Sequence, residues 1–488
     1  MTTALRPYSR QSQFWGPSPD TVLAQDHLAR VVDEFVESLP LQRLNRHYEH
    51  TPGEPAYDLR LLCKVWILAY GRGLTSAREL ARQCVENLAF RFLTDGQCPD
   101  HRTLSGFRRN YRRLLRWVFA QTVLLGRQMG LVRLGLVAID SVKLQADARP
   151  GRKRTSQQLK ELLRRLDTYL AQLATQDKLD DQTYGVGADA ESLPRKLRQL
   201  KAPRHKLARA LDKLQAEQQQ QRDAGKPRIR KDVIPTAPDA VWVKKHGRII
   251  PGYNCHAAVD EACGMVVALK ADACPAERDQ LNPMLKEVEQ TAGAPAQTAL
   301  ADNGYYTDAA IVQAESGSTR CLVPDGLSAH QLHQGQRPQP ADPYHCDNFT
   351  YDPQADQFTC PQGRKLTLKK QHFRRGQPST VYAAIACADC PVRDQCTRDK
   401  HGLRTIQVHR DHPLIRRAKH RLRSPEGQAL YRKRKTIAEP LFGQWQHNRG
   451  VRRLRLRGLK GCDIELHLLA IGHNLKKFWK QGARFSRN

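Results

Sequence analysis

The spacing of apolar residues divides the chain into helical and strand-forming stretches. Residues 20–130 carry apolar positions at helical spacing, including the run LRLLCKVWILAY, and predict an all-α region. Ser76 and Glu79 form a capping box that opens one of these helices, which we expect to continue to about Phe92. The pattern then changes to LGLVAIDSVKLQADA, which alternates as in a strand and places Asp140 inside it.

Two leucine-rich stretches follow between residues 153 and 221. The leucine spacings in the first stretch are 4, 3, 4 and 3, at Leu159, Leu163, Leu166, Leu170 and Leu173. A second series from Leu193 to Leu214 nearly repeats this spacing. The pattern predicts two amphipathic helices packed as an antiparallel hairpin, with the leucines as a packing seam and not a chemical site.

The remaining strands of a sheet are predicted after residue 235. The stretch NCHAAVDEACGMVVALKAD has two apolar runs around a turn at Gly264, which predicts a β-hairpin. An amphipathic helix follows, then a small strand ending at Asp302 and a helix capped by Thr307 or Asp308. Strand, hairpin, helix, strand and helix in this order begin a ribonuclease H-like core, in which the first and fourth strands lie side by side. We therefore expect an α/β fold with a mixed sheet.

A cysteine-rich stretch interrupts the core pattern between residues 325 and 430. It contains CPQG and CADCPVRDQC, whose CxxC pair and two further thiolates suit tetrahedral zinc. The predicted zinc ligands are Cys360, Cys387, Cys390 and Cys396, with His345 and Cys346 as substitutes. A reduced cysteine-rich loop without metal is the alternative. The odd total of 13 cysteines disfavours a disulfide framework.

The charge of the chain points to a polyanionic partner. Lys and Arg number 80 against 49 Asp and Glu, a formal net charge of +31, and nucleic acid is the leading candidate. A generally basic surface without a specific partner is the alternative.

Two clusters of cations have a spacing that suits DNA. A polar turn and a basic helix near residues 98–113 predict a helix-turn-helix unit, with a helical bundle and a solvated basic face as the alternative. A second basic run precedes Glu439 on one predicted helix and would grip phosphates beside a cut. The predicted DNA-binding residues are Arg102, Arg108, Arg109, Arg112, Arg432, Arg434 and Lys435.

Three carboxylates stand where phosphodiester chemistry would need them. Two divalent ions stabilise the attacking and leaving oxygens of such a reaction, and Mg²⁺ prefers hard oxygen ligands. Asp140 inside an apolar strand is costly unless paired or metal-bound, and Glu439 lies among apolar residues of a helix. Asp302 ends a strand, where a turn-forming role is the alternative. Rival carboxylates are Asp147, Asp260 and Glu465.

Several motifs in this order resemble the insertion-sequence transposases that have an N-terminal helical domain and a DDE catalytic domain with a cysteine-bearing insert. The matching stretches are CPDHRTLSGFRR, VAIDSVKLQADA, GYNCHAAVD, ALADNGYYTD, the cysteine module and KRKTIAEPLFGQWQ. The resemblance makes Asp140, Asp302 and Glu439 the catalytic, metal-binding triad, with Mg²⁺ or Mn²⁺. It implies cleavage at terminal inverted repeats and strand transfer into target DNA.

The chain departs from the family pattern beside the third carboxylate. Gln446 stands where a Lys is usual, and Tyr431 and Arg434 are one residue farther from Glu439 than in related elements. A ribonuclease H-like nuclease without strand transfer and a catalytically silent DNA-binding protein are therefore kept as alternatives.

The resemblance also predicts the organisation, partners and location of the protein. Expected partners are double-stranded DNA of the element ends and target, and a second copy in the DNA complex. Without a signal peptide or a membrane-spanning apolar run, we expect a cytoplasmic, nucleoid-associated protein. The expected parts are an N-terminal helical DNA-binding domain at 1–130, the first part of the catalytic core at 131–150 and 235–324, a helical hairpin at 151–234, a cysteine-rich insertion at 325–426 and a C-terminal helical part of the core at 427–488.

Overall fold

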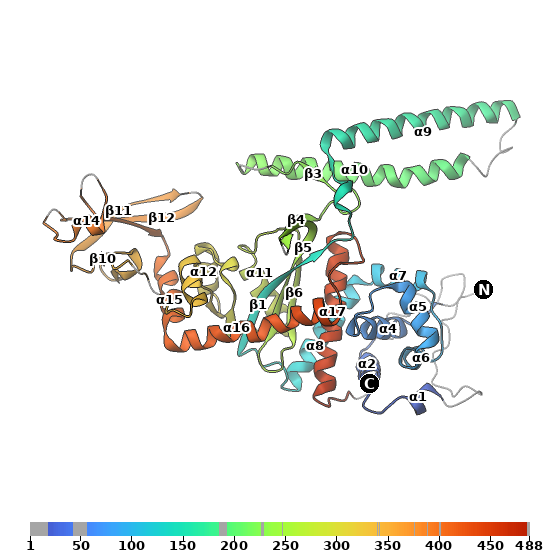
Figure 1. Ribbon diagram of the computed structural model, residues 1–488, viewed down its shortest axis with the longest axis horizontal. Helices are drawn as coiled ribbons and strands as arrows, with labels where there is room; N and C mark the ends of the chain where they lie inside the picture. Colours follow the sequence, from blue (N-terminus) through green and yellow to red (C-terminus); the bar gives the residue numbers. More distant parts are fainter. Residues whose placement is uncertain are drawn as a thin grey trace.

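The computed structural model describes residues 18–41, 56–184, 193–225, 229–245, 247–338, 340, 342–374, 376–387, 389–399 and 402–485. Within these ranges the predicted all-α beginning is confirmed (Figure 1). Its helices are α1 (Pro19–Val22), α2 (Leu28–Glu37), α4 (Leu59–Gly71), α5 (Ala77–Glu86), α6 (Leu88–Thr94), α7 (His101–Asn110) and α8 (Arg112–Gln128). The helix expected to reach Phe92 ends earlier, because the Asn87 side chain caps a new helix by accepting a hydrogen bond from the Ala89 amide.

A mixed sheet forms the centre of the molecule, as predicted. Its order is β4-β5-β1-β7-β8, and β6 also pairs with β5. β1 runs antiparallel to β5 and parallel to β7, so the first strand of the core lies between the β-hairpin and the later parallel strands. The strands are β1 (Leu136–Gln145), β4 (Val241–Lys245), β5 (Arg248–Asp260), β6 (Val266–Asp272), β7 (Thr298–Leu300) and β8 (Arg320–Leu322).

Helices cover this sheet and connect it to the N-terminal region (Figure 1). α16 packs on β1, whereas α11 and α17 pack on β6. α12 and α15 pack together beside β8. The helices of this layer are α11 (Leu281–Ala292), α12 (Asp308–Glu315), α13 (Gly326–His333), α15 (His412–Arg423), α16 (Pro425–Gly443) and α17 (Gly458–Lys480).

The C-terminal helix α17 joins the sheet to the N-terminal helices. It crosses α4 where Gly472 faces Gly71, and a Cβ on Gly472 would lie 2.7 Å from the Gly71 nitrogen, so only glycine permits this approach. On the other side of α17, the buried Asn474 amide bonds both the N–H and the carbonyl of Val266 at 2.9 Å. The N-terminal region is therefore packed firmly onto the core.

The predicted helical hairpin is present as α9 (Ser156–Tyr184) and α10 (Leu193–Asp223), which pack against each other and project from the body of the molecule (Figure 1). Part of the leucine seam is described: Leu159, Ala210 and Leu214 form a small core with Val233. A short ladder of β2 (Arg154–Thr155) with β3 (Asp232–Val233) closes the base of the hairpin.

The cysteine-bearing stretch is a five-stranded antiparallel sheet in the order β13-β12-β11-β10-β9, which the sequence did not lead us to expect. Its polar composition hid the strands, since charged residues occupy half of the exposed positions of β11. Figure 1 places this module at the opposite end of the molecule from the N-terminal helices. The strands are β9 (Thr350–Asp352), β10 (Gln357–Thr359), β11 (Lys365–Arg374), β12 (Gln377–Ala384) and β13 (Thr405–His409), with the short helix α14 (Arg393–Cys396).

Among the described residues, no helix combines the length and apolar character needed to cross a membrane.

Candidate active site

Two of the predicted carboxylates come from neighbouring parallel strands. In the pairing of β1 with β7, Ala138 lies opposite Leu300, and Asp140 and Asp302 each follow two residues later. Ala138 and Leu300 belong to the apolar cluster under α16. Because side chains two residues apart lie on the same face of a strand, this register directs both aspartates toward α16. The sheet therefore brings Asp140 and Asp302 together.

Helix α16 lies over this pair and adds a cation. Ala438 and Tyr431 pack into the cluster beneath the helix, and Arg434 lies between them on the same face. The Arg434 Nη1 atom is 3.4 Å from Asp140 Oδ2. Burial lowers the pKa of Arg434, but the nearby anionic groups, among them Asp140, raise it above its usual value.

The two aspartates are poorly compensated for their burial. Burial is the main cause that raises the pKa of Asp140 to about 6, and the charge of Asp302 adds to it. Burial also raises the pKa of Asp302, and the charge of Glu277 is the next contribution. Each aspartate accepts a single backbone hydrogen bond, Asp140 from Ser141 at 2.8 Å and Asp302 from Gly304 at 2.9 Å. An additional cation would relieve this repulsion.

Glu277 is a further carboxylate at this place that the sequence interpretation missed. It follows β6 in a loop, and its Oε1 accepts a hydrogen bond of 2.6 Å from the Ser141 hydroxyl. A Cβ built on Gly304 would meet Glu277 Oε2 at 2.3 Å and Asp302 Oδ1 at 3.0 Å, so these two carboxylates lie over the same glycine. No local pattern distinguishes Glu277, because its partners come from other strands.

A buried aromatic pair stands behind the carboxylates. His256 Nδ1 and the Tyr305 hydroxyl are 2.7 Å apart, and both side chains are fully buried. Burial and the charges of Glu277, Asp140 and Asp302 raise the pKa of Tyr305. Burial, together with Lys270, lowers the pKa of His256 to about 3. Both groups are therefore neutral near pH 7 and do not balance the acidic charge.

The third predicted carboxylate, Glu439, has a different setting. It follows Ala438 on α16, its side chain is exposed, and its charge acts on Arg434. Within the described ranges, none of the hydrogen bonds or ion pairs joins Glu439 to Asp140 or Asp302. Gln446, at the position where a Lys is usual, lies in a π-helical turn of residues Gln444–Asn448 after the helix.

The three rival carboxylates have structural partners elsewhere. Asp260 accepts backbone hydrogen bonds from Arg133, Leu134 and Ala262. Asp147 pairs with Arg453 and Arg457. Glu465 is fully buried and accepts hydrogen bonds from Tyr70 and from two backbone amides. We therefore no longer consider them candidates for the acidic site.

Two family models match the chain. One, described as Transposase DDE domain, matches residues 359–479, and the other, described as Transposase domain (DUF772), matches residues 18–110. Together the two matches support a DDE transposase of the insertion-sequence type with an N-terminal helical region. The first match contains α16 with Arg434 and Glu439, whereas Asp140 and Asp302 lie between the two matched segments. A comparison with curated proteins gave no significant match.

One of the transposase's predicted DNA contacts is wrong. Arg108 is only 4% exposed, and its guanidinium donates to the Tyr70 hydroxyl and the Thr75 carbonyl, each at 2.8 Å. It also lies over the Trp66 ring, 4.4 Å from the centroid. The buried charge of Glu465 nearby explains why a cation is retained there. Arg108 therefore holds the core together and cannot reach a phosphate.

The other predicted contacts on the N-terminal helices differ in their exposure. Arg102 and Arg109 are exposed on α7. Arg112 begins α8 and is held by Asp463 at 2.7 Å, so its charge is already partly neutralised.

The basic residues of α16 lie on two different faces of the helix. Arg434 faces the aspartates, whereas Arg432 and Lys435 point to solvent. Lys433 on the exposed side pairs with Glu261 at 2.7 Å. Among the described residues, neither Arg432 nor Lys435 forms an ion pair, so both cations are available beside the acidic site.

The four predicted zinc ligands line one small pocket of the cysteine module. The Cys360 sulfur accepts a 3.3 Å hydrogen bond from the Arg364 amide, and all four cysteines are free thiols. Burial is the main cause that raises the pKa of Cys396, and the other three cysteines add to it. No three of these sulfurs lie within 4.8 Å of one another in the described part of the chain. A tetrahedral zinc would therefore require them to move closer.

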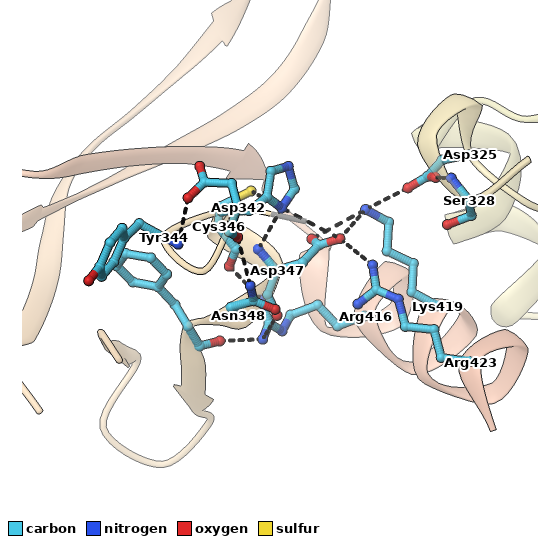
Figure 2. A network of polar contacts seen from close by, with 12 residues as sticks. Asp325, Ser328, Asp342, Tyr344, Cys346, Asp347, Asn348, Arg416, Lys419 and Arg423 are labelled. Carbon is cyan, nitrogen blue, oxygen red and sulfur yellow. Dashed lines mark hydrogen bonds and ion pairs between the residues drawn. The ribbon is translucent and has the colours of Figure 1, made fainter. Parts of the chain in front are cut away.

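The substitute ligands His345 and Cys346 do come close to a carboxylate, Asp347, within 4.8 Å. Figure 2 shows why this trio serves another purpose: Asp347 points to Lys419 and Arg423 of α15. Burial raises the pKa of Asp347, but these two cations hold it below its usual value. The carboxylate is already neutralised, and it fastens the cysteine module to the core.

Proposed function

We propose that this transposase cleaves DNA at the terminal repeats of its element and joins the freed 3′ hydroxyl to target DNA. The observation that carries the proposal is the register of β1 and β7, which places Asp140 and Asp302 side by side under Arg434. Burial raises the pKa of both aspartates, and the charges of the neighbouring carboxylates add to it. Such a pair suits divalent ions, and the family implies their use.

The residues at the site fit Mg²⁺ or Mn²⁺. The donors are hard carboxylate oxygens on adjacent strands, and the repulsion among them would be relieved by a doubly charged ion. When bound, the metal would activate the attacking oxygen and stabilise the leaving oxygen of the phosphodiester. Asp140 and Asp302 would hold it, and Arg434 would stabilise the negative charge of the phosphate.

The third acidic residue has two candidates with different support. Glu439 lies in the matched transposase domain and on the helix that carries Arg434. Glu277 stands beside Asp302 in the structure. We propose that Glu439 would complete the metal ligands as the motif residue, and that Glu277 is a second candidate that already lies beside Asp302.

The cations around the site would hold the double-stranded DNA. Arg432 and Lys435 on α16 would contact phosphates beside the cut, and Arg102 and Arg109 on α7 would contact the element end at a greater distance. We further propose that two copies assemble on the paired ends.

The experiment uses the purified transposase and duplexes with the inverted repeats that flank its coding region. We expect Mg²⁺-dependent cleavage and strand transfer, with Asp302→Ala losing both while DNA affinity persists. Equal cleavage by Asp302→Ala would refute the site. Cleavage without strand transfer would support the nuclease alternative, and binding without either reaction would support a silent DNA-binding protein.

The two candidates for the third residue are separated by Glu439→Gln and Glu277→Gln, with Glu261→Gln as a matched exposed control. Both site variants should lower cleavage, and the control should not. If Glu277→Gln behaves as the control, only Glu439 completes the triad.

We also propose that Cys360, Cys387, Cys390 and Cys396 bind Zn²⁺. Soft thiolates around one pocket, with an amide bonded to one sulfur, support this donor set. Metal analysis of the purified protein should give one zinc per chain, lost in Cys387→Ser/Cys390→Ser. Protein without zinc in both forms would favour a reduced loop.

A further inference from the structure

A basic β-hairpin projects from the cysteine module and has no role in the site described above. It consists of β11 and β12, and we call it the basic hairpin. Between Cys360 and Cys387 the sequence has no Asp or Glu. The Lys and Arg residues in this stretch are Arg364, Lys365, Lys369, Lys370, Arg374 and Arg375. Such a concentration of positive charge favours the binding of an anionic partner.

The outer half of the basic hairpin is free of partners on one edge. β10 pairs with β11 only at Lys365–Thr367, whereas β12 continues alongside it to Arg374. The register shifts between Leu368 and Lys370, which is a β-bulge at the point where β11 becomes an edge strand. Beyond the bulge, nearly all described side chains of β11 are exposed.

The cations of this edge form no ion pair with any residue that the structure describes. None of the described ion pairs includes Lys369, Lys370 or Arg374. Arg374 donates to the neutral Gln407 side chain at 2.6 Å, and Gln407 also contacts His372. The Arg374 guanidinium is therefore oriented by an uncharged side chain of β13.

Exposed apolar side chains accompany these cations. Phe373 is 70% exposed, and the Arg410 guanidinium lies 5.9 Å from its ring centroid. Leu368 is 45% exposed on the same strand. Lysines alone on an edge strand would serve to prevent aggregation. An exposed phenylalanine works against that purpose, so the combination fits a partner with both anionic and apolar surfaces.

We propose that the basic hairpin is an arm that binds duplex DNA. Lys369, Lys370 and Arg374 would contact phosphates, and Phe373 would lie against a sugar or base. A two-stranded β-ribbon has the width of the major groove, and duplex DNA combines phosphates with apolar sugar and base faces. The hairpin belongs to the module that continues into α15 and α16, the helix of Arg434. This inference rests on the proposed DNA-processing function.

The test compares two variants that each lose three exposed cations. Lys369→Gln/Lys370→Gln/Arg374→Gln alters the basic hairpin, and Lys160→Gln/Lys206→Gln/Arg222→Gln alters the helical hairpin of α9 and α10. Affinity for an element-end duplex is measured by fluorescence anisotropy over a range of salt concentrations. The basic-hairpin variant should bind the duplex roughly tenfold more weakly. Its plot of log affinity against log salt concentration should be less steep by about 2 to 3, since each lost phosphate contact removes about 0.9 from the slope.

A second pair of variants tests the aromatic contact. Phe373→Ala should weaken binding roughly fivefold without changing the salt slope, because it removes apolar contact and no charge. Tyr169→Ala, on the exposed side of α9, is its control and should have no effect. Circular dichroism melting of all variants verifies that each is folded.

The outcomes separate this proposal from the proposed function. Wild-type protein that neither binds nor cleaves element ends refutes the proposed function. If the wild type does both and the two triple variants bind equally, the hairpin proposal is wrong and the effect is one of total charge. If Phe373→Ala leaves DNA affinity unchanged but lowers the mass of the protein in solution, the hairpin binds a second copy instead.

Discussion

Carboxylates shielded from solvent occur in two settings in this molecule. Asp140 lies within β1 and Asp302 just after β7, and both are half-buried. Each accepts a hydrogen bond from a backbone amide, and Arg434 lies 3.4 Å from Asp140. Elsewhere, Glu465 accepts three hydrogen bonds from Tyr70 and two amides, and Asp260 accepts three from backbone amides. Glu465 and Asp260 are more deeply buried than the two half-buried aspartates, and they also accept more hydrogen bonds.

The difference separates carboxylates that stabilise the fold from those that destabilise it without a ligand. Hydrogen bonds to Glu465 and Asp260 offset the cost of removing them from water. Asp140 and Asp302 accept fewer hydrogen bonds, and the charge of Asp302 adds to the cost of burying Asp140. Such an arrangement is typical of a functional site. Four predictions test the comparison, in order of decreasing effect.

Arg108→Ala should give the largest loss of stability. It leaves Glu465 buried without its nearby cation, which costs about 3 to 5 kcal/mol of unfolding free energy. Arg109→Ala, the exposed neighbour on α7, is the control and should change stability by less than about 0.5 kcal/mol. Urea denaturation measures both, and equal effects would contradict the structural role of Arg108.

Asp140→Asn should lower Mg²⁺-dependent cleavage more than about 100-fold, because even residues behind metal ligands cost 10- to 100-fold. The same change should not destabilise the metal-free protein, since it removes a repelled charge. Asp147→Asn, whose carboxylate pairs with two arginines, should keep most of the cleavage activity. If Asp140→Asn lowers the melting temperature, Asp140 stabilises the fold in the way that Glu465 and Asp260 do.

The stability of the metal-free protein should depend on pH through Asp140. In the unfolded chain this carboxyl has its ordinary pKa of 3.8, whereas burial raises the pKa to about 6 in the folded protein. Between these two pH values the folded state binds more protons than the unfolded state. The unfolding free energy therefore falls as the pH rises from about 4 to about 6, and it falls no further through this group above that range. The loss should be about 2 kcal/mol after discounting for partial exposure.

The measurement is the difference in unfolding free energy between wild type and Asp140→Asn at several pH values. The unfolding free energy of Asp140→Asn should increase relative to that of the wild type as the pH rises. Adding Mg²⁺ should abolish this difference, because the ion stabilises only the wild type. A difference that does not vary with pH would show that Asp140 titrates normally.

Asp260→Asn should have the smallest effect. The asparagine retains one oxygen, so only part of the hydrogen bonding to the amides of Leu134 and Ala262 is lost, at a cost of about 1 kcal/mol. Cleavage should be unchanged, because Asp260 lies outside the acidic site. A cleavage defect with normal stability would return Asp260 to the list of catalytic candidates.

Interactions between residues close in the chain made much of the fold predictable. The Ser76 and Thr307 caps bond amides three residues away, and the strand of Asp140 shows its period of two within a short window. The order of these elements was enough to expect Asp140 and Asp302 on adjacent strands, and the pairing of β1 with β7 confirms this expectation.

Contacts between distant residues decided the chemical environment of each side chain. Glu277 reaches Ser141 across 136 positions of sequence, and Tyr70 reaches Glu465 across 395, so no local pattern could distinguish a clustered carboxylate from a bonded one. Arg108 and Arg109 are equivalent in the sequence, yet packing buries the first and exposes the second. Burial and charge compensation are properties of the assembled core, and they set pKa values and accessibility, whereas local periodicity sets only the type and order of the elements.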